Sequence, residues 1–299
     1  MTDASAPPLR PLGVGDIVDR TITLYRASPW LFIILAAIPY LIFAVLSGVL
    51  GAALFVGAAG VPTISPTADP TALLNAFTAL IPALIVYAIA IVITFSAQAG
   101  ALIDAMSKRH VGTPTTVRTS LVSGLRASVR MILAAICAFV FYAIVILLAS
   151  IVIGIVSSVV NNGIVGVVGA VAIFVLMFYV LASLMVVPAV VTVEGAGPIR
   201  AIRRSWTLAG GARWRILGLL LLMFVLLFIL YVLLAFLLLG VLSVNTGLQL
   251  VLQQVISVIV DVVWAPIWWG VFTVLYYDLR VRKEAFDLQL AAEAMPRAT

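Results

Sequence analysis

Six long apolar runs limit what this chain can fold into more than any other feature of its sequence. The runs are Trp30–Val56, Ala72–Ile103, Met131–Val160, Ile164–Val193, Ile216–Val244 and Leu248–Tyr277. Each is longer than the roughly 20 helical residues that cross about 30 Å of hydrocarbon. Only 9% of the residues are charged, against about 25% in an ordinary soluble domain, so a polar surface cannot cover all of these runs. The sequence therefore predicts a polytopic membrane protein.

The runs also predict how the chain is organised. They are continuously apolar and lack the period of two that transmembrane strands show, so the predicted fold class is all-α, with six transmembrane helices in three hairpins. A polar stretch of 29 residues precedes the first run, and that run is about twice as long as the apolar part of a signal peptide. We expect residues 1–299 to form a single integral membrane domain that ends in a tail at 279–299.

The basic residues predict the orientation of these spans. All 17 Lys and Arg residues fall in segments 1–29, 104–130, 194–215 and 278–299, which share one side of the membrane if the chain crosses six times. The positive-inside rule places that side, and both termini, in the cytoplasm. The net charge of +6 then reflects topology. A nucleic-acid partner is not expected, because the chain has no basic soluble module with stacking aromatic residues.

One basic segment, "PIRAIRRSWTLAGGARWRI" (Pro198–Ile216), places five arginines between two apolar runs. Its predicted apolar helix face consists of Ile199, Ile202, Trp206 and Ala209, which recur at helical spacing. A short helix with a Trp on one face and arginines on the other is typical of a helix in the plane of a membrane surface.

Arginines of this kind are candidates for contact with anionic lipid headgroups or with a protein partner in the membrane. Near an anionic leaflet each contributes about 1 kcal/mol of binding free energy. The candidate residues are Arg200, Arg203, Arg204, Arg213, Arg215, Arg118, Arg130 and Trp206. The alternative is that these side chains only fix the topology and anchor the helices.

An internal repeat links these basic segments. "TVRTSLVSGLRASVRMIL" (116–133) aligns without gaps with "AIRRSWTLAGGARWRILG" (201–218). A looser third copy lies near the N-terminus, with a predicted apolar stripe of Val14, Val18, Ile22 and Tyr25. We predict three units, 14–104, 115–194 and 198–278, each a surface helix followed by two spans. Each second span closes with an acid; these acids are Asp104, Glu194 and Asp278.

Asp261 is the one acidic residue deep inside an apolar run. A carboxyl group at mid-membrane costs about 2.5–3.5 kcal/mol on insertion, so its helical stripe with Gln254 and Ser257 should face the bundle interior. It is either a structural residue, bonded for example to Thr94 or Gln98 of the second run, or a proton or cation site in a transport path.

Helix packing and chemistry can also be predicted. Small residues four apart, such as Ser150, Gly154 and Ser158, predict a close helix contact.

The single histidine and single cysteine, His110 and Cys137, exclude an internal disulfide and leave no metal-ligand cluster. No phosphate-binding loop, G-x-S-x-G or H-E-x-x-H motif occurs, so neither a cofactor nor a metal is expected. A lipid-headgroup enzyme would have to use the three acids at the span ends, which as a rule form topology-setting ion pairs.

Three stretches carry a family resemblance. "GVGDIVDRTITLYR", "PAVVTVEGAGPIRAIRRSWTLAGG" and "LYYDLRVRKEAFDL" resemble bacterial integral membrane proteins grouped with the membrane domain of glycerophosphoryl diester phosphodiesterase. The resemblance covers nearly the whole chain and implies a bacterial inner-membrane protein with six spans. In the named enzymes a separate soluble barrel carries out hydrolysis, so no catalytic residue is transferred.

These observations predict a non-enzymatic integral inner-membrane protein that contacts lipid or supports a membrane assembly. The alternative function is a transporter or channel that uses the Asp261 stripe.

Overall fold

The computed structural model describes residues 11–58, 70–160, 163–239 and 246–289, which form nine helices and no strand. The helices are α1 (Val14–Ala27), α2 (Pro29–Ala58), α3 (Pro70–His110), α4 (Val117–Val160), α5 (Gly163–Leu184), α6 (Val187–Val193), α7 (Pro198–Ala209), α8 (Arg213–Leu239) and α9 (Thr246–Glu284). Six helical segments are long and apolar enough to cross a membrane, one in each of α2, α3, α4, α8 and α9 and one formed by α5 with α6. The all-α prediction with six candidate spans is confirmed.

The three basic segments join their spans in different ways. Ser28 separates α1 from α2, and Gly210–Ala212, with Gly211 at a φ of +77°, separates α7 from α8. The middle segment was expected to break as well, but α4 runs unbroken from Val117 to Val160. The reason is local, because this segment contains neither a proline nor a glycine with positive φ to end the helix.

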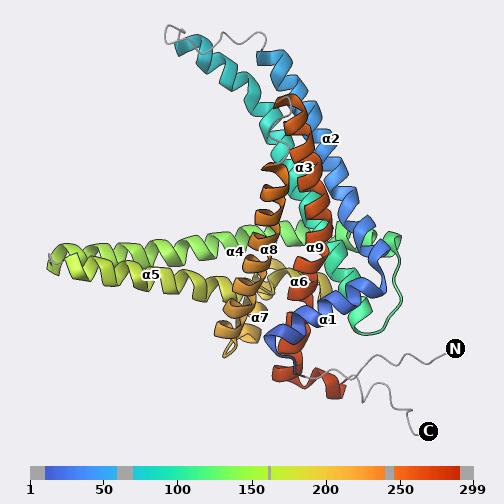
Figure 1. The fold of residues 1–299 in the computed structure, drawn as a ribbon. Helices are drawn as coiled ribbons and strands as arrows, with labels where there is room; N and C mark the ends of the chain where they lie inside the picture. The colour runs from blue at the N-terminus through green and yellow to red at the C-terminus, as the bar shows by residue number, and fades with distance from the viewer. Residues whose placement is uncertain (1–10, 59–69, 161–162, 240–245, 290–299) are drawn as a thin grey trace.

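The helices form two arms that diverge from a common base (Figure 1). Helices α2, α3, α8 and α9 run together in one direction and make up the four-helix arm. Helices α4 and α5 extend in a clearly different direction and make up the two-helix arm. The short helices α1, α6 and α7 lie at the base, where the arms meet.

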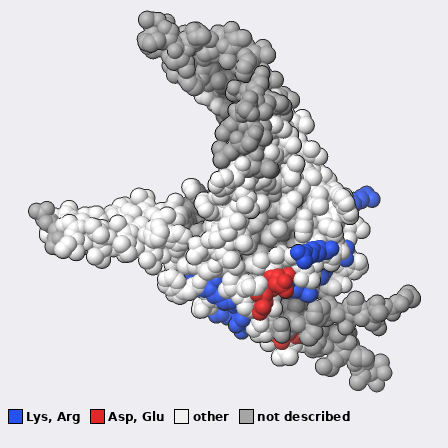
Figure 2. All heavy atoms as spheres, viewed as in Figure 1, with Lys and Arg blue, Asp and Glu red and all other residues white. Residues whose placement is uncertain are grey.

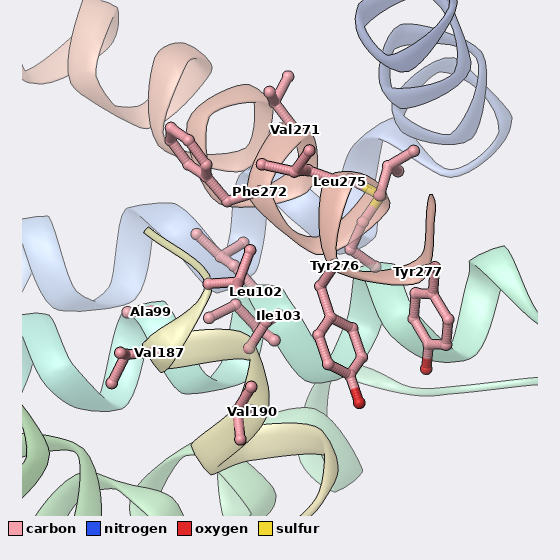
Figure 3. Close-up of a cluster of buried hydrophobic side chains, with 14 of the residues drawn as sticks. Ala99, Leu102, Ile103, Val187, Val190, Val271, Phe272, Leu275, Tyr276 and Tyr277 are labelled. Atoms are coloured by element: carbon pink, nitrogen blue, oxygen red, sulfur yellow. The ribbon is translucent and has the colours of Figure 1, made fainter. Parts of the chain in front are cut away.

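The core of the protein lies at this base. Leu102 and Ile103 of α3, Val190 of α6, and Leu275 and Tyr276 of α9 pack together and are almost completely buried (Figure 3). By contrast, most large apolar side chains toward the tip of the two-helix arm are exposed. Burial by protein is therefore concentrated where the arms join.

A close approach of two glycines fixes the crossing of α3 and α4. A Cβ atom placed on Gly124 would lie 2.4 Å from the carbonyl oxygen of Ala97 and 2.6 Å from the amide nitrogen of Ala101. On Gly100 it would lie 3.0 Å from the Cα atom of Gly124. Only glycine fits at this point of α4, because the obstructing atoms belong to the backbone.

Candidate functional site

The Lys and Arg side chains of the described residues gather at the base, on the side away from both arms (Figure 2). We call this surface the charged face. It consists of α1, the end of α3, the first turns of α4, α7, the start of α8 and the end of α9. The carboxylates that close the three predicted units lie among these basic residues, and each has defined partners.

Asp278, near the end of α9, has a completely buried side chain. It accepts a hydrogen bond of 2.7 Å from the backbone N–H of Leu12. Arg215 contacts its other oxygen at 2.8 Å, and Arg282 contacts it at 3.1 Å. Arg215 and Arg282 also donate to the carbonyl oxygen of Leu12, at 2.6 and 2.9 Å. The segment before α1 is thus tied to α8 and α9.

Glu194, after α6, belongs to a second network centred on Arg204 of α7. The Arg204 guanidinium donates to Glu194 at 3.0 Å and makes a two-point ion pair with Glu284. The Tyr276 hydroxyl donates to Glu194 at 2.8 Å, and Arg280 donates to Glu284 at 3.0 Å. The hydrogen bonds from Arg204 to Glu284 and Glu194 raise the pKa of this arginine above its usual range. It is therefore permanently charged and committed to contacts within the protein.

Asp104, near the end of α3, has the simplest surroundings of the three acids. It pairs with Lys108 one turn later at 2.8 Å and accepts a hydrogen bond of 2.9 Å from the hydroxyl of Ser123 on α4. Asp104 and Glu194 thus contact the segments that open the second and third predicted units, and Asp278 contacts Leu12, two residues before the first predicted unit begins. The division into three units itself stays a prediction.

The structure divides the predicted lipid-contact residues into two groups. Arg204 and Arg215 are held by carboxylates, as described above. Arg213 donates to the Ser183 hydroxyl at 2.7 Å and stacks on the ring of Tyr179. Arg130 donates to the carbonyl oxygen of Gly195 at 2.8 Å. Arg130 is exposed and has no carboxylate within ion-pair distance among the described residues, and the same holds for Arg118, Arg200 and Arg203.

Trp206 is half-buried between α7 and the two-helix arm, and its contact with lipid stays a prediction. Its ring packs edge to face against Phe141 of α4, with ring centroids 5.8 Å apart, and against Tyr179 of α5 at 6.1 Å. Arg213 lies 5.0 Å from the centroid of the same ring. Trp206 therefore attaches α7 to the two-helix arm.

The buried faces of the two surface helices differ from the predicted ones. The buried residues of α7 are Ala201, Ser205, Leu208 and Ala209. Of the predicted face, Ala209 is among them and Ile202 packs half-buried against the core, whereas Ile199 is 63% exposed. The buried residues of α1 are Ile17, Thr21 and Leu24, next to the predicted stripe of Val14, Val18, Ile22 and Tyr25. Small and hydroxyl-bearing side chains are buried because they allow close helix approach; the Ser205 hydroxyl donates to the Ser183 carbonyl at 2.6 Å.

A basic pocket of about 580 Å³ opens between α3, α4 and α6. Its four cationic side chains are Lys108, Arg118, Arg126 and Arg130, with the hydroxyl-bearing Thr119, Ser123 and Thr192 between them. Only Arg118 and Arg130 were predicted from the sequence. Arg126 could have been found from its spacing, since it stands two helical turns after Arg118 and one turn before Arg130.

An apolar groove of about 490 Å³ lies between α5 and α8, where the two arms separate. Phe174, Phe178 and Phe224 contribute most of its aromatic lining. Arg213 and Trp214, the latter 78% exposed, line its end nearest the charged face.

The stripe at Asp261 is partly exposed on α9, and Gln254 is exposed. The Tyr231 hydroxyl of α8 donates to Asp261 across 3.4 Å. Gln98, one of the predicted partners of Asp261, instead donates to the carbonyl oxygen of Ala36 at 3.0 Å. In the described part of the chain, no group of three or more His, Cys, Asp or Glu residues is placed to hold a metal ion.

Comparison with known proteins gives one match. Residues 12–279 match the family model described as a domain of unknown function, DUF7847. The chain belongs to the DUF7847 family. The matched region begins at Leu12 and ends one residue after Asp278, so it includes both partners of the contact that ties the segment before α1 to α9. No curated protein and no solved structure matches the chain.

Proposed function

We propose that this DUF7847 protein is a non-enzymatic integral protein of the bacterial inner membrane that binds anionic lipid at its charged face. In this proposal its six spans form three hairpins, its surface helices and both termini lie on the cytoplasmic side, and the lipid contact supports a membrane assembly. The resemblance to the membrane domain of glycerophosphoryl diester phosphodiesterase favours the same location.

The uneven pairing of the arginines is the observation that supports this function. Arg204 and Arg215 satisfy buried or half-buried carboxylates, so they are explained by the fold. Arg200 and Arg203 lie exposed on α7 with no carboxylate in ion-pair distance among the described residues. Exposed guanidinium groups beside apolar spans are well placed for the phosphates of an anionic leaflet.

Lipid retention tests the proposal. The full chain is reconstituted in bilayers that contain phosphatidylglycerol and phosphatidylcholine, released in mild detergent, and its bound lipids are counted by native mass spectrometry. Wild type should retain phosphatidylglycerol preferentially, and Arg200→Gln with Arg203→Gln should lower that retention several-fold.

The matched control is Arg200→Lys with Arg203→Lys, which keeps both charges and should keep most of the retention. Equal retention of the two lipids by wild type would reject the proposed function. If the Gln variant retains as much phosphatidylglycerol as wild type, the arginines of α7 do not contribute to lipid binding.

A second candidate function, a transporter or channel, depends on Asp261. The contact with Tyr231 across 3.4 Å places two titratable groups together on α8 and α9. An ion path would need water to reach this pair, so the observation supports transport less directly than the exposed arginines support lipid binding.

A further inference from the structure

The basic pocket carries more positive charge than the fold itself uses. Arg118, Arg126 and Arg130 are separated by multiples of four residues along α4, so they lie on one face of the helix. Like charges four residues apart, as in Arg126 and Arg130, destabilise a helix. Arg118 and Arg126 are exposed, and the described residues place no carboxylate within ion-pair distance of either.

Among the described residues, Asp104 is the carboxylate that compensates for part of this charge. It pairs with Lys108 and accepts the hydroxyl hydrogen of Ser123. Four cations against one carboxylate leave an excess of three positive charges at the pocket. A concave site lined by one sign of charge concentrates the field and attracts an ion of the opposite sign.

The hydroxyl groups that line the pocket already donate to other acceptors of the protein. The hydroxyl hydrogens of Thr119 and Thr192 go to carbonyl oxygens of their own chain segments, Thr116 at 2.9 Å and Pro188 at 2.9 Å. Arg130 uses one nitrogen on the Gly195 carbonyl, which holds its guanidinium at the pocket wall. The remaining N–H groups of the arginines and of Lys108 are the available donors, and the planar fork of a guanidinium matches the oxygens of a phosphate.

We propose that this pocket binds a dianionic phosphate group, the phosphomonoester of a lipid headgroup or of a soluble phosphate. This inference rests on the proposed lipid-binding function and names the headgroup chemistry. A phosphomonoester carries about −1.5 to −2 charges at pH 7, because its second pKa is about 6, whereas a phosphodiester carries one. Exposed Leu125 and Val129 beside the pocket give acyl chains an apolar path along α4.

The test compares phosphatidic acid, a phosphomonoester, with phosphatidylglycerol, a phosphodiester. Both are offered to the full chain in phosphatidylcholine nanodiscs, and bound lipid is measured by native mass spectrometry. Wild type should prefer phosphatidic acid at a pH of about 7.5, where its phosphate is largely dianionic. Arg118→Gln with Arg126→Gln should lower phosphatidic acid affinity about 30-fold, the equivalent of about 2 kcal/mol for two arginines.

The matched control, Arg200→Gln with Arg203→Gln, removes the same charge from α7 but leaves the basic pocket intact, so phosphatidic acid should still be preferred over phosphatidylglycerol. The preference should weaken below about pH 6, where the phosphomonoester becomes a monoanion. Millimolar inorganic phosphate forms the second arm of the test. Competition by it would show that the phosphate group alone is recognised, and phosphatidic acid binding without competition would show that the lipid is required.

Two results separate the inference from the function on which it rests. If wild type retains phosphatidic acid and phosphatidylglycerol equally, but both above phosphatidylcholine, the phosphomonoester site is wrong and lipid binding stands. The phosphomonoester site is also wrong if the preference survives in the Arg118 and Arg126 variant. If neither anionic lipid exceeds phosphatidylcholine, the proposed function fails as well.

Discussion

The carboxylate of Asp278 accepts the backbone N–H of Leu12 at 2.7 Å, across 266 positions of sequence. Arg215 and Arg282 bond both to this carboxylate and to the Leu12 carbonyl oxygen. Groups from the segment before α1, from α8 and from α9 therefore satisfy one another around a fully buried carboxylate. This contact ties the segment that precedes the first predicted unit to the last unit, at the base of the protein.

The first prediction concerns this buried carboxylate. Asp278→Asn removes a negative charge that two arginines share, and loss of one partner from a buried pair costs about 3–5 kcal/mol. We expect the thermal unfolding midpoint in detergent, followed by intrinsic fluorescence, to fall by several degrees. Asp104→Asn is the control, because that side chain is partly exposed and has one basic partner. If the unfolding midpoint falls equally in both variants, the network around Asp278 and Leu12 stabilises the protein no more than the Asp104 pair does.

The six spans could be predicted from sequence because hydropathy reports the solvent of each segment and needs no knowledge of neighbours. The buried faces of α1 and α7 could not, since they depend on which helix covers them. Ser205 and Thr21 are completely buried, although a hydrophobicity pattern assigns them to the polar side. The contact of Leu12 with Asp278 was equally inaccessible, because a backbone amide has no sequence signature. Arg126, in contrast, has a spacing from which its place in the basic pocket could have been predicted.

The second prediction tests where helices approach most closely. Gly124→Ala should separate α3 from α4, since the new Cβ atom would meet backbone atoms at 2.4 and 2.6 Å. We expect a markedly lower unfolding midpoint, consistent with steric overpacking of about 1–3 kcal/mol or more. Gly154→Ala is the matched control, because nothing lies within 4 Å of the added atom. The sequence predicted a close helix contact at Gly154, which the structure does not show. A large fall of the unfolding midpoint in Gly154→Ala would indicate that this contact forms after all.

The third prediction concerns orientation. If the charged face is cytoplasmic, a reporter enzyme active only in the periplasm should be active when fused near Pro66 and inactive when fused near Pro114, because the latter site lies beside Lys108 and Arg118. Activity in cells is the measurement. The reverse pattern would place the charged face outside, and activity at both sites would show that the run between them, Ala72–Ile103, does not cross the membrane.

The fourth prediction addresses Asp261. The Tyr231 hydroxyl can donate to an amide oxygen as well as to a carboxylate, so Asp261→Asn should leave the unfolding midpoint within about 2 °C of wild type, an effect below about 0.5 kcal/mol. Tyr231→Phe should behave alike. Proton or cation flux into vesicles decides between the two functions. A wild-type flux that vanishes in the stable Asn variant would favour the transporter over the lipid-binding protein.

The last prediction follows from the lengths of the helices. Helix α2 has 30 residues, about 45 Å at 1.5 Å per residue, and the apolar run Met131–Val160 of α4 has the same length. A straight helix of this length fits within about 30 Å of hydrocarbon only if its axis tilts strongly. Two arms that lean in opposite directions satisfy this requirement together, with the charged face at their common base (Figures 1 and 2).

Spin labels can test this geometry. With Cys137→Ser as background, labels at Val159 on α4 and Val255 on α9, both exposed, should lie well beyond about 30 Å apart in nanodiscs, because the two arms that carry them diverge from the base (Figure 1). In an upright bundle, adjacent helices lie about 8–10 Å apart, and the same labels would be separated by less than about 30 Å. A short distance would mean that the arms close in the bilayer and that the long runs extend beyond its hydrocarbon. A long one would leave the apolar groove between α5 and α8 open to lipid, because no helix would fill the space between the arms.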